Sequence, residues 1–292
     1  MDKVSIVLVN YNGDSDTLDC IKSLNKVKYE NVEIIVVDNA SKTQIELEKR
    51  VPDDVVFIKS KENLGFSGGN NLGIKYAIDH GADYVILLNN DTVVNDSFIY
   101  ELLCSAKRHK NAGLITGKIY FYSQPKHIWY AGGYMNLERA RIHHFHSTEE
   151  DTFHDEEKRV SFATGCLMMI HKSVIDKIGM LDEAYFMYAE DAEYCARIQK
   201  NKYEIWYNPN AIIYHKVSRS SGGGGSKLSQ YYRARNEMYL VAHNARHKVI
   251  GCMCCAIRLV KRMIVGQFTV KCVYWGLKDC IQLNMGKSNR SF

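Results

Sequence analysis

Short apolar runs that end at polar residues recur through the first third of the chain, and they restrict its fold more than any other feature. They cover residues 4–9, 32–37, 55–58 and 84–88. Stretches with the helical spacing of apolar side chains separate them, such as the one that carries Leu18, Ile21 and Leu24. Near-continuous apolar strands that alternate with helices predict an α/β domain. We expect a Rossmann-like, mostly parallel central sheet with helices on both faces.

Polar side chains follow three of the expected strands. Asn10 ends the first, Asp38 ends the second, and Asn89-Asn90-Asp91 ends the fourth. Ligands of open α/β sheets bind beyond the carboxyl ends of the strands, so we expect these side chains to line one functional edge. The Asp38 carboxylate only accepts hydrogen bonds, which suits recognition of a base or ribose.

Asp91 is a candidate metal ligand. Mg²⁺ and Mn²⁺ prefer oxygen ligands, and a strand end holds a carboxylate rigidly. The alternative is that Asp91 only forms a turn or caps a helix.

A glycine-rich stretch, residues 65–73, precedes an expected helix, and its backbone N–H groups could approach a diphosphate. Its match to Gly-x-Gly-x-x-Gly is imperfect. A dinucleotide-binding oxidoreductase would carry such a turn directly after the first strand. Asn10-Tyr-Asn-Gly13 stands there instead, which argues against that class.

Glu190 and Asp191 lie at the start of an expected helix over residues 190–200. A reaction in which a hydroxyl attacks needs a general base to accept the hydroxyl proton. Two adjacent carboxylates raise each other's pKa toward neutrality, which suits such a base. The alternative is that the pair only stabilises the helix dipole.

Two groups of potential metal ligands are better explained by structure. The first lies in a polar stretch, residues 139–159, for which we expect a solvated hairpin or loop; it comprises His143, His144, His146 and His154. The second comprises Cys252, Cys254 and Cys255, which contain one C-x-x-C spacing without a second pair. Buried free thiols in an apolar helix are favoured over zinc.

The composition is that of a globular protein, with 46% hydrophobic and 24% charged residues among 292. A formal charge of +5 does not indicate a nucleic-acid partner. Nine cysteines, an odd number, favour a reducing compartment. The chain begins almost directly with a strand, shows no signal peptide, and has no run of about 18 apolar residues. We therefore expect a cytoplasmic protein.

Residues 241–292 differ from residues 1–240 and predict a separate, basic helical region. Its cations lie among apolar side chains: Arg258, Lys261, Arg262, Lys271 and Lys278. A helix on an anionic membrane surface, such as the inner face of the plasma membrane, explains this pattern. A packed tail or a homodimer contact explains it equally well. Residues 222–226, Gly-Gly-Gly-Gly-Ser, resemble an engineered linker in composition but are interpreted as a mobile loop near the site.

Eight motifs then occur in a characteristic order. They are Val9-Asn-Tyr-Asn12, Val36-Val-Asp-Asn-Ala-Ser41, Glu62-Asn-Leu-Gly-Phe-Ser-Gly-Gly-Asn-Asn-Leu-Gly73, Leu87-Leu-Asn-Asn-Asp-Thr92, Ala163-Thr-Gly-Cys-Leu-Met168, Phe186-Met-Tyr-Ala-Glu-Asp191, His215 and Tyr232-Arg-Ala-Arg-Asn236. With these motifs, residues 3–240 resemble the family 2 glycosyltransferases of the GT-A fold, in their rhamnosyltransferase-like branch.

The resemblance implies a role for each matched position. Asp38 would bind the nucleobase, and Asp191 would be the catalytic base, with Glu190 beside it either supporting Asp191 or binding the acceptor. Asp91 would be the last residue of the metal-binding DxD motif, in which Asn89 replaces the first Asp, and His215 would complete the metal shell. The other residues implied in donor binding are Asn10, Asn12, Asn63, Gly69, Asn70 and Asn90, with Arg233 and Arg235 as a clamp on the diphosphate.

The resemblance also implies an inverting transfer, assisted by Mn²⁺ or Mg²⁺, from a nucleoside diphosphate sugar to a hydroxyl of a glycan or lipid-linked acceptor. The branch favours dTDP-rhamnose, with surface polysaccharide or glycolipid as the product. Transfer from UDP-galactose, UDP-N-acetylglucosamine or UDP-galactofuranose stays open. A non-catalytic sugar-nucleotide binding protein of the same fold also stays open.

Overall fold

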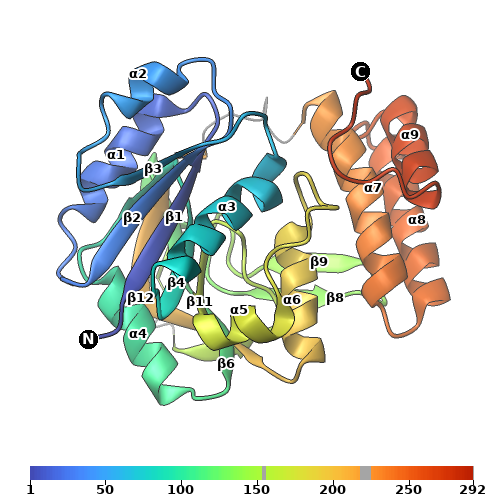
Figure 1. Cartoon of the computed structure of the whole chain (residues 1–292). Helices are drawn as coiled ribbons and strands as arrows, with labels where there is room; N and C mark the ends of the chain where they lie inside the picture. Colours follow the sequence, from blue (N-terminus) through green and yellow to red (C-terminus); the bar gives the residue numbers. More distant parts are fainter. Residues whose placement is uncertain (153–155, 218–224, 292) are drawn as a thin grey trace.

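The centre of the computed structural model, which describes residues 1–152, 156–217 and 225–291, is one large sheet (Figure 1). Its parallel part comes from the first motif-bearing strands, in the order β4-β1-β2-β3. These are β1 (Val4–Asn10), β2 (Val32–Asp38), β3 (Val56–Lys59) and β4 (Tyr84–Asn89). Helices α1 (Asp14–Leu24) and α2 (Gln44–Glu48) lie on one side of these strands, and α3 (Gly65–Asp79) lies on the other.

Helix α3 packs unusually close to β1, and two glycines allow it. A Cβ on Gly73 would lie 2.3 Å from Val7 Cγ1, and one on Gly69 would lie 2.9 Å from Val9 Cγ1. The glycine-rich stretch is therefore part of a helix that is pressed against the sheet rather than an open phosphate-binding loop.

The second half of the sheet is mixed. It contains β5 (Thr92–Val94), β6 (Ala112–Phe121), β7 (Gln124–Tyr130), β10 (Lys158–Val160), β11 (Leu167–His171) and β12 (Glu204–His215). Strand β11 runs antiparallel between β4 and β6, whereas β12 is parallel to β6. Helices α4 (Phe98–Arg108), α5 (Lys172–Ile178) and α6 (Glu190–Lys200) connect and cover these strands. The prediction of an α/β fold with a largely parallel sheet is confirmed.

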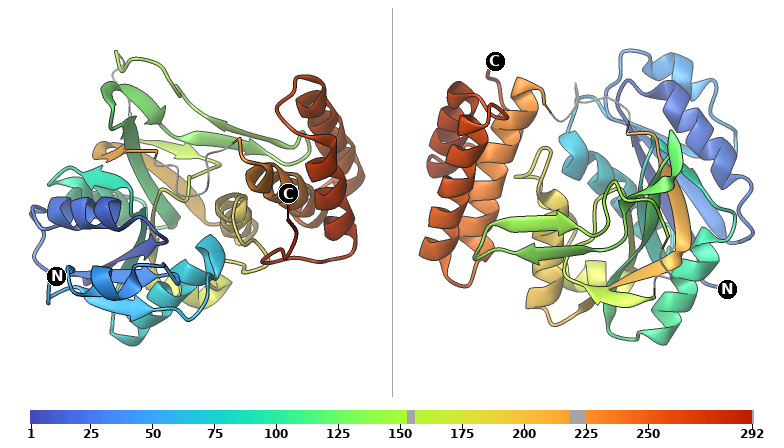
Figure 2. Two further views of the ribbon diagram at one scale, coloured as in Figure 1. Left: turned by 90° about the horizontal axis from the view of Figure 1, so that it is seen from above. Right: turned by 180° about the vertical axis from the view of Figure 1, so that it is seen from behind.

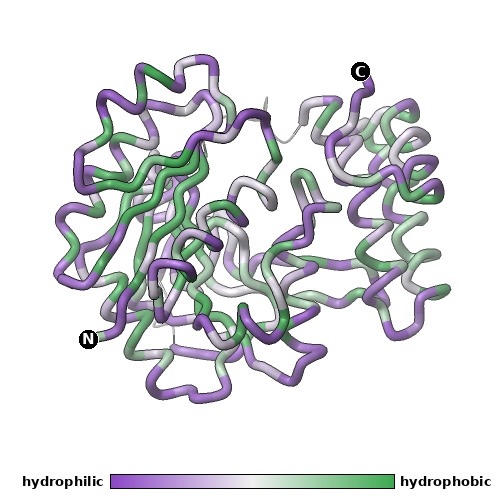
Figure 3. The backbone as a smooth tube through the Cα atoms, viewed as in Figure 1, coloured by the Kyte–Doolittle hydropathy of each residue, from purple (hydrophilic) through white to green (hydrophobic). Residues whose placement is uncertain are grey.

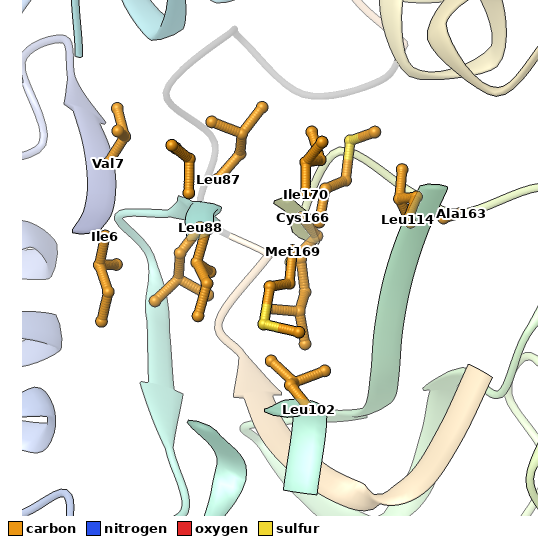
Figure 4. Packing of buried hydrophobic residues seen from close by; sticks show 14 of the residues in the cluster. Ile6, Val7, Leu87, Leu88, Leu102, Leu114, Ala163, Cys166, Met169 and Ile170 are labelled. Carbon is orange, nitrogen blue, oxygen red and sulfur yellow. The ribbon is translucent and has the colours of Figure 1, made fainter. Parts of the chain in front are cut away.

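The core lies where the strands meet the helices. Ile6, Leu88 and Met169 come from three neighbouring strands and lie on one face of the sheet, with Leu102 of α4 beneath them (Figure 4). Hydrophobic residues concentrate along the strands of the sheet, as the tube in Figure 3 shows. Burial on both faces explains why the strands read as continuous apolar runs.

The histidine-rich stretch forms the expected hairpin, with β8 (Gly133–Asn136) antiparallel to β9 (Arg141–His144). The His144 ring packs edge-on against Trp129 and Tyr130. His154 lies outside the described residues. Within the described ranges, no group of three or more His, Cys, Asp or Glu side chains is placed to hold a metal ion.

Helices α7 (Lys227–Asn244), α8 (Lys248–Ile264) and α9 (Val270–Ile281) form a bundle beside the α/β domain (Figure 2). Its own apolar cluster includes Ala234, Val241, Leu259 and Val273. Helix α7 crosses the expected boundary at residue 240 without a break, and through Leu240 it also contributes to the core of the α/β domain.

The bundle contacts the α/β domain through the β8–β9 hairpin as well as through α7 (Figure 2). The hairpin turn accepts hydrogen bonds from α8 and from the turn before it: Arg258 donates to the Ala140 carbonyl, and the Arg246 N–H donates to Glu138 at 3.1 Å. The Cys252, Cys254 and Cys255 thiols are free; Cys255 is buried as expected, whereas Cys252 and Cys254 are only half-buried. Within the described residues, no helix has the length and apolar character needed to cross a membrane. The predicted loop at residues 222–226 lies mostly outside the described residues.

Candidate active site

A cavity of about 910 Å³ opens between the carboxyl ends of β1 and β4, the segment before α6, and the bundle. Of the residues implied in function, those that line it are Asn63, Asn70, Asn90, Asp91, Glu190, Asp191 and His215. These residues come from four separate segments of the chain. Of the three strand ends expected to meet there, the end of β4 lines the cavity.

Asp91 and His215 form one pole of this cavity. Strand β12 pairs with β5 so that His215 lies opposite Thr92, directly after Asp91. Asp91 Oδ1 and His215 Nε2 are 3.1 Å apart, both side chains are buried, and the His215 ring packs edge-on against Trp129. Within the described part of the chain, His215 Nδ1 has no hydrogen-bond partner.

The charge of this pair is set by two opposing effects. Burial disfavours the imidazolium, but the Cys166 sulfur and the Asp91 carboxylate favour it, and the pKa of His215 rises to about 10. When His215 is protonated, its contact with Asp91 is an ion pair. A carboxylate and an imidazole turned toward each other also fit a shared divalent cation, which would take the place of that proton.

Glu190 and Asp191 form the second pole, at the start of α6. Asp191 Oδ2 accepts a hydrogen bond from the Gly165 N–H at 3.0 Å, and Oδ1 accepts one from the Ala192 N–H at 2.8 Å. Burial raises the pKa of Asp191 despite these bonds. Glu190 is buried, and among the described residues its Oε2 has no partner. Burial and the neighbouring Asp191 raise the pKa of Glu190 well above its usual range.

Hydrogen bonds distinguish the two carboxyls. The N–H groups of Gly165 and Ala192 favour the ionised form of Asp191, whereas the Glu190 Oε2 atom has no hydrogen-bond partner among the described residues. Asp191 is therefore the group that can accept a proton from a hydroxyl in the cavity.

The segment before this pair is strained and is held from two sides. Tyr188 and Ala189 have φ angles of 68° and 72°, a region that side-chain-bearing residues rarely adopt. The Asn236 amide of α7 donates to the carbonyls of both Met187 and Tyr188 at 2.9 Å. On the other side, the Phe66 N–H of α3 donates to the Phe186 carbonyl at 2.8 Å.

Gly65 is required at the α3 contact. Its φ is +73°, and a Cβ there would lie 2.0 Å from the Phe186 carbonyl oxygen. The glycine-rich motif therefore serves the catalytic segment through close packing.

Asn10 and Asp38 lie beneath the cavity rather than in it. Both are fully buried, and the Asn10 amide donates to Asp38 Oδ2 at 2.8 Å. Asp38 Oδ1 accepts from the Ser41 N–H at 2.9 Å and from Gln44 at 2.8 Å. These bonds join the ends of β1 and β2, and they leave the Asp38 carboxylate unavailable to a nucleobase in this arrangement.

Two more of the implied donor residues also lie outside the cavity lining. Asn12 accepts a hydrogen bond from the Lys42 N–H and fixes the loop after β1. Gly69 is buried within α3 against Val9. Near these positions, the side chains that do line the cavity are Tyr11 and Asn39.

The expected arginine clamp is not in the cavity either. The Arg235 guanidinium is fully buried and donates to the carbonyls of Asn284 and Gly286 at 3.0 and 2.8 Å. Arg233 lies against Glu237 and the Phe268 ring, and its guanidinium is also 6.0 Å from the ring of Tyr188, which lines the cavity. Arg235 faces the bundle because α7 packs against α9, a contact that the motif alone does not reveal.

Several lining residues were not singled out from the sequence. Three of them, Tyr11, Thr164 and Tyr232, stand inside the quoted motifs and could have been found there. Trp129 comes from β7, and Lys287 and Ser288 come from the segment after α9. Those three positions carry no recognisable spacing, so only the tertiary structure finds them.

Comparisons with known proteins agree with this geometry. The sequence model described as "Glycosyl transferase family 2" matches residues 5–179. The chain is 30% identical over 218 residues to the low-salt glycan biosynthesis hexosyltransferase Agl10 of Haloferax volcanii, a match that covers 70% of this chain and 64% of Agl10. It is 27% identical over 248 residues to the dTDP-rhamnosyl transferase RfbF of Shigella flexneri, covering 82% of this chain and 79% of RfbF. The chain thus spans less than two thirds of the length of Agl10.

A solved structure supports the fold. The mannosyltransferase PcManGT from Pyrobaculum calidifontis, in complex with GDP-Man and Mn²⁺, has a TM-score of 0.57 and 12% identity, and the match covers 96% of this chain and 80% of that one. The family match extends over more than half of the chain, and the sheet places the motif residues at one edge. The chain has the GT-A fold and belongs to glycosyl transferase family 2.

Proposed function

We propose that this protein transfers a sugar from a nucleoside diphosphate sugar to a hydroxyl group of an acceptor, with inversion at the anomeric carbon. The observation that carries the proposal is the pair of poles in one cavity: Asp91 with His215 at a strand end, and Asp191 at the start of α6. The first suits a diphosphate with its cation, and the second suits a hydroxyl that must lose its proton.

The reaction is a single displacement. The acceptor oxygen attacks the anomeric carbon while the bond from that carbon to the diphosphate oxygen breaks. The hydroxyl proton passes to an Asp191 carboxylate oxygen, and the nucleoside diphosphate leaves with the bonding electrons. The Gly165 and Ala192 N–H groups hold the Asp191 carboxylate in place for this transfer.

Asp91 and His215 are the residues that would hold a divalent cation, Mn²⁺ or Mg²⁺. When bound, the cation would neutralise the charge that develops on the leaving diphosphate. Two protein ligands are typical of cations that complete their shell with substrate phosphates and water. The mannosyltransferase with the similar fold was solved with Mn²⁺, which supports this assignment.

The donor that the relatives favour is dTDP-rhamnose, because RfbF is named a dTDP-rhamnosyl transferase. UDP-hexose, UDP-N-acetylhexosamine and UDP-galactofuranose donors are the alternatives. The acceptor would be a glycan or a lipid-linked saccharide of a surface polysaccharide or glycolipid, in keeping with the glycan biosynthesis enzyme among the relatives.

We further propose that the bundle rests on an anionic membrane surface, with a homodimer contact as the alternative. One face of α8 exposes a helical stripe of apolar residues: Val249, Ile250, Met253, Ile257, Val260 and Ile264. Residues 241–292 carry nine Lys or Arg and a single acidic residue, Asp279, whereas the whole chain has a formal charge of +5. An apolar stripe within a strongly basic region matches a surface of negative lipid headgroups better than a second copy of itself.

The proposal is tested with the whole chain and a panel of sugar nucleotides. Release of free nucleoside diphosphate is measured with Mn²⁺ and with chelator, in the presence of simple glycoside acceptors. We expect one donor to give acceptor-dependent release that the chelator removes. Binding without turnover for every donor and acceptor would favour a non-catalytic sugar-nucleotide binding protein instead.

A further inference from the structure

The segment that follows α9, residues 284–290, is fastened to the bundle at three points. Arg235 donates to the Asn284 and Gly286 carbonyls, and the Ser288 N–H donates to the Tyr232 hydroxyl at 2.8 Å. Arg290 forms two hydrogen bonds of 2.6 Å with the Asp279 carboxylate. The backbone of residues 284–290 is therefore fixed on both sides of Lys287.

Burial of the Arg235 guanidinium is unfavourable unless the group is hydrogen-bonded. The carbonyls that accept its hydrogen bonds therefore have to stay in place. Arg235 is fully buried, and its guanidinium lies over the rings of Tyr231 and Tyr232. Within the described residues it forms no ion pair. A buried guanidinium requires hydrogen-bond acceptors, and the two carbonyls of the segment supply them.

The fixed segment places the positively charged Lys287 at the active-site cavity. Lys287 and Ser288 line the cavity beside Tyr232, on the side that the bundle forms. Among the described lining residues, Lys287 is the sole Lys or Arg, whereas Asp91, Glu190 and Asp191 supply three carboxyls. In the part of the chain that the structure describes, the Lys287 ammonium forms no ion pair, and the side chain is exposed.

We propose that Lys287 binds phosphate oxygens of a substrate in this cavity and takes the clamping role expected of an arginine on α7. This inference rests on the proposed binding of a sugar nucleotide in the same cavity. An exposed ammonium on a rigid backbone segment is a suitable donor to phosphate, which it contacts as a point charge. The phosphate belongs either to the donor diphosphate or to a phosphate that links the acceptor sugar to a lipid.

The experiment uses the whole chain and three variants. Lys287→Gln removes the charge, Lys287→Arg keeps it, and Lys271→Gln removes an exposed charge of α9 that does not line the cavity. Affinities for dTDP, UDP and inorganic pyrophosphate are measured by calorimetry with Mn²⁺. KM is measured for an alkyl-diphosphate-linked sugar and for the matching alkyl glycoside without phosphate.

If the phosphate is that of the donor, Lys287→Gln weakens binding of the diphosphates about tenfold, while Lys287→Arg and Lys271→Gln change it little. If the phosphate is that of the acceptor, diphosphate affinity stays constant and only the KM of the phosphate-linked acceptor rises. Unchanged values for both, or an equal effect of Lys271→Gln, would overturn the role of Lys287.

A second variant tests the fastening of the segment. Arg290→Gln removes the bonds to Asp279 and leaves Lys287 intact. We expect a smaller change in the same direction, with no further loss when it is combined with Lys287→Gln, because both act through one contact. Additive losses would contradict this. Binding of pyrophosphate that depends on Lys287, without turnover of any donor, would overturn the proposed transferase function alone. Failure of the unaltered chain to bind any diphosphate would overturn both.

Discussion

The Asn236 side chain holds the peptide of Tyr188 in place, with its amide nitrogen 2.9 Å from the Tyr188 carbonyl oxygen. The same nitrogen reaches the Met187 carbonyl, so one side chain of α7 fixes the strained turn that ends at Glu190 and Asp191. The bundle is thus joined to the catalytic segment. The residues that form this contact are far apart in the sequence, so the sequence alone does not reveal it.

Asn236→Ala is expected to lower kcat about 10- to 100-fold with little change in donor affinity, because a misplacement of about 1 Å in a catalytic group costs a factor of that order. The variant should also lose about 1–3 kcal/mol of unfolding free energy, since two buried carbonyls lose their donor. Steady-state kinetics and donor titration measure the two effects separately. Asn244→Ala is the control, because among the described residues that amide donates a hydrogen bond only to the Leu240 carbonyl of its own helix. Equal effects of both variants would show that Asn236 acts through stability alone.

Asp191→Asn is expected to keep donor binding and to reduce transfer by about 100- to 10,000-fold, the usual contribution of a positioned base. The amide oxygen can still accept from one of the two backbone N–H groups, Gly165 or Ala192, so the side chain keeps its size and one of its two hydrogen bonds. Donor affinity by calorimetry and nucleotide release by kinetics give the comparison. Turnover close to that of the unaltered chain would remove Asp191 from the base role.

Glu190→Gln is expected to change how stability depends on pH. The folded-state pKa of Glu190 lies well above that of an unfolded Glu, because burial and Asp191 disfavour the charge. Between these two values the folded state binds more protons than the unfolded state, so unfolding free energy falls as pH rises through that window. Gln imitates the protonated carboxyl and removes this loss.

The measurement is the melting temperature of both forms from about pH 4, near the usual pKa of Glu, to pH 8. The two forms should melt alike at the acid end, and the variant should melt progressively higher as pH rises. If the melting temperatures of both forms changed with pH in the same way, ionisation of Glu190 would not destabilise the folded state. That result would contradict the raised pKa of Glu190.

Asp91→Asn is expected to weaken Mn²⁺-dependent donor binding by at least about tenfold, or about 1.4 kcal/mol. The amide keeps the size of the side chain but loses the charge that attracts the cation. Donor affinity is titrated with Mn²⁺ and with chelator. Asp96→Asn is the control, since Asp96 forms an ion pair with Lys28 on the surface. A variant that responds to chelator as the unaltered chain does would place the cation elsewhere.

The sequence predicts the sheet well because its strands are buried on both faces and leave a clear apolar signal. It also predicts which motifs meet, because parallel strands bring their carboxyl ends to one edge. Asp91 and His215 are 124 residues apart and still pair, since β5 and β12 are neighbours in the sheet.

The sequence does not predict which polar side chain of a motif faces the cavity. Asp38 and Asn10 turn inward to join two strand ends, and Arg235 turns toward the bundle, because each finds partners there. Lys287 lines the cavity because the segment after α9 packs on the bundle, and no spacing of residues in the sequence indicates this contact. The sequence shows cations among apolar residues in the C-terminal helices, but which face is exposed depends on how α8 packs on α7.

The exposed stripe of α8 gives the last prediction. Met253 and Ile257 are 61% and 63% exposed and lie one turn apart, so both would enter a lipid headgroup layer together. Replacing both with Glu should lower binding to phosphatidylglycerol-containing vesicles at least about tenfold, because it removes apolar burial and adds charges that the lipid repels. Ile45→Glu on α2, where Ile45 is 62% exposed, is the control. Binding should also weaken with salt, since the basic residues act through screened charge. Co-sedimentation with vesicles measures these effects, and light scattering follows the oligomeric state. The alternative is that α8 forms a contact between two copies of the chain. In that case the unaltered chain would not bind vesicles, and the double substitution would change it from dimer to monomer.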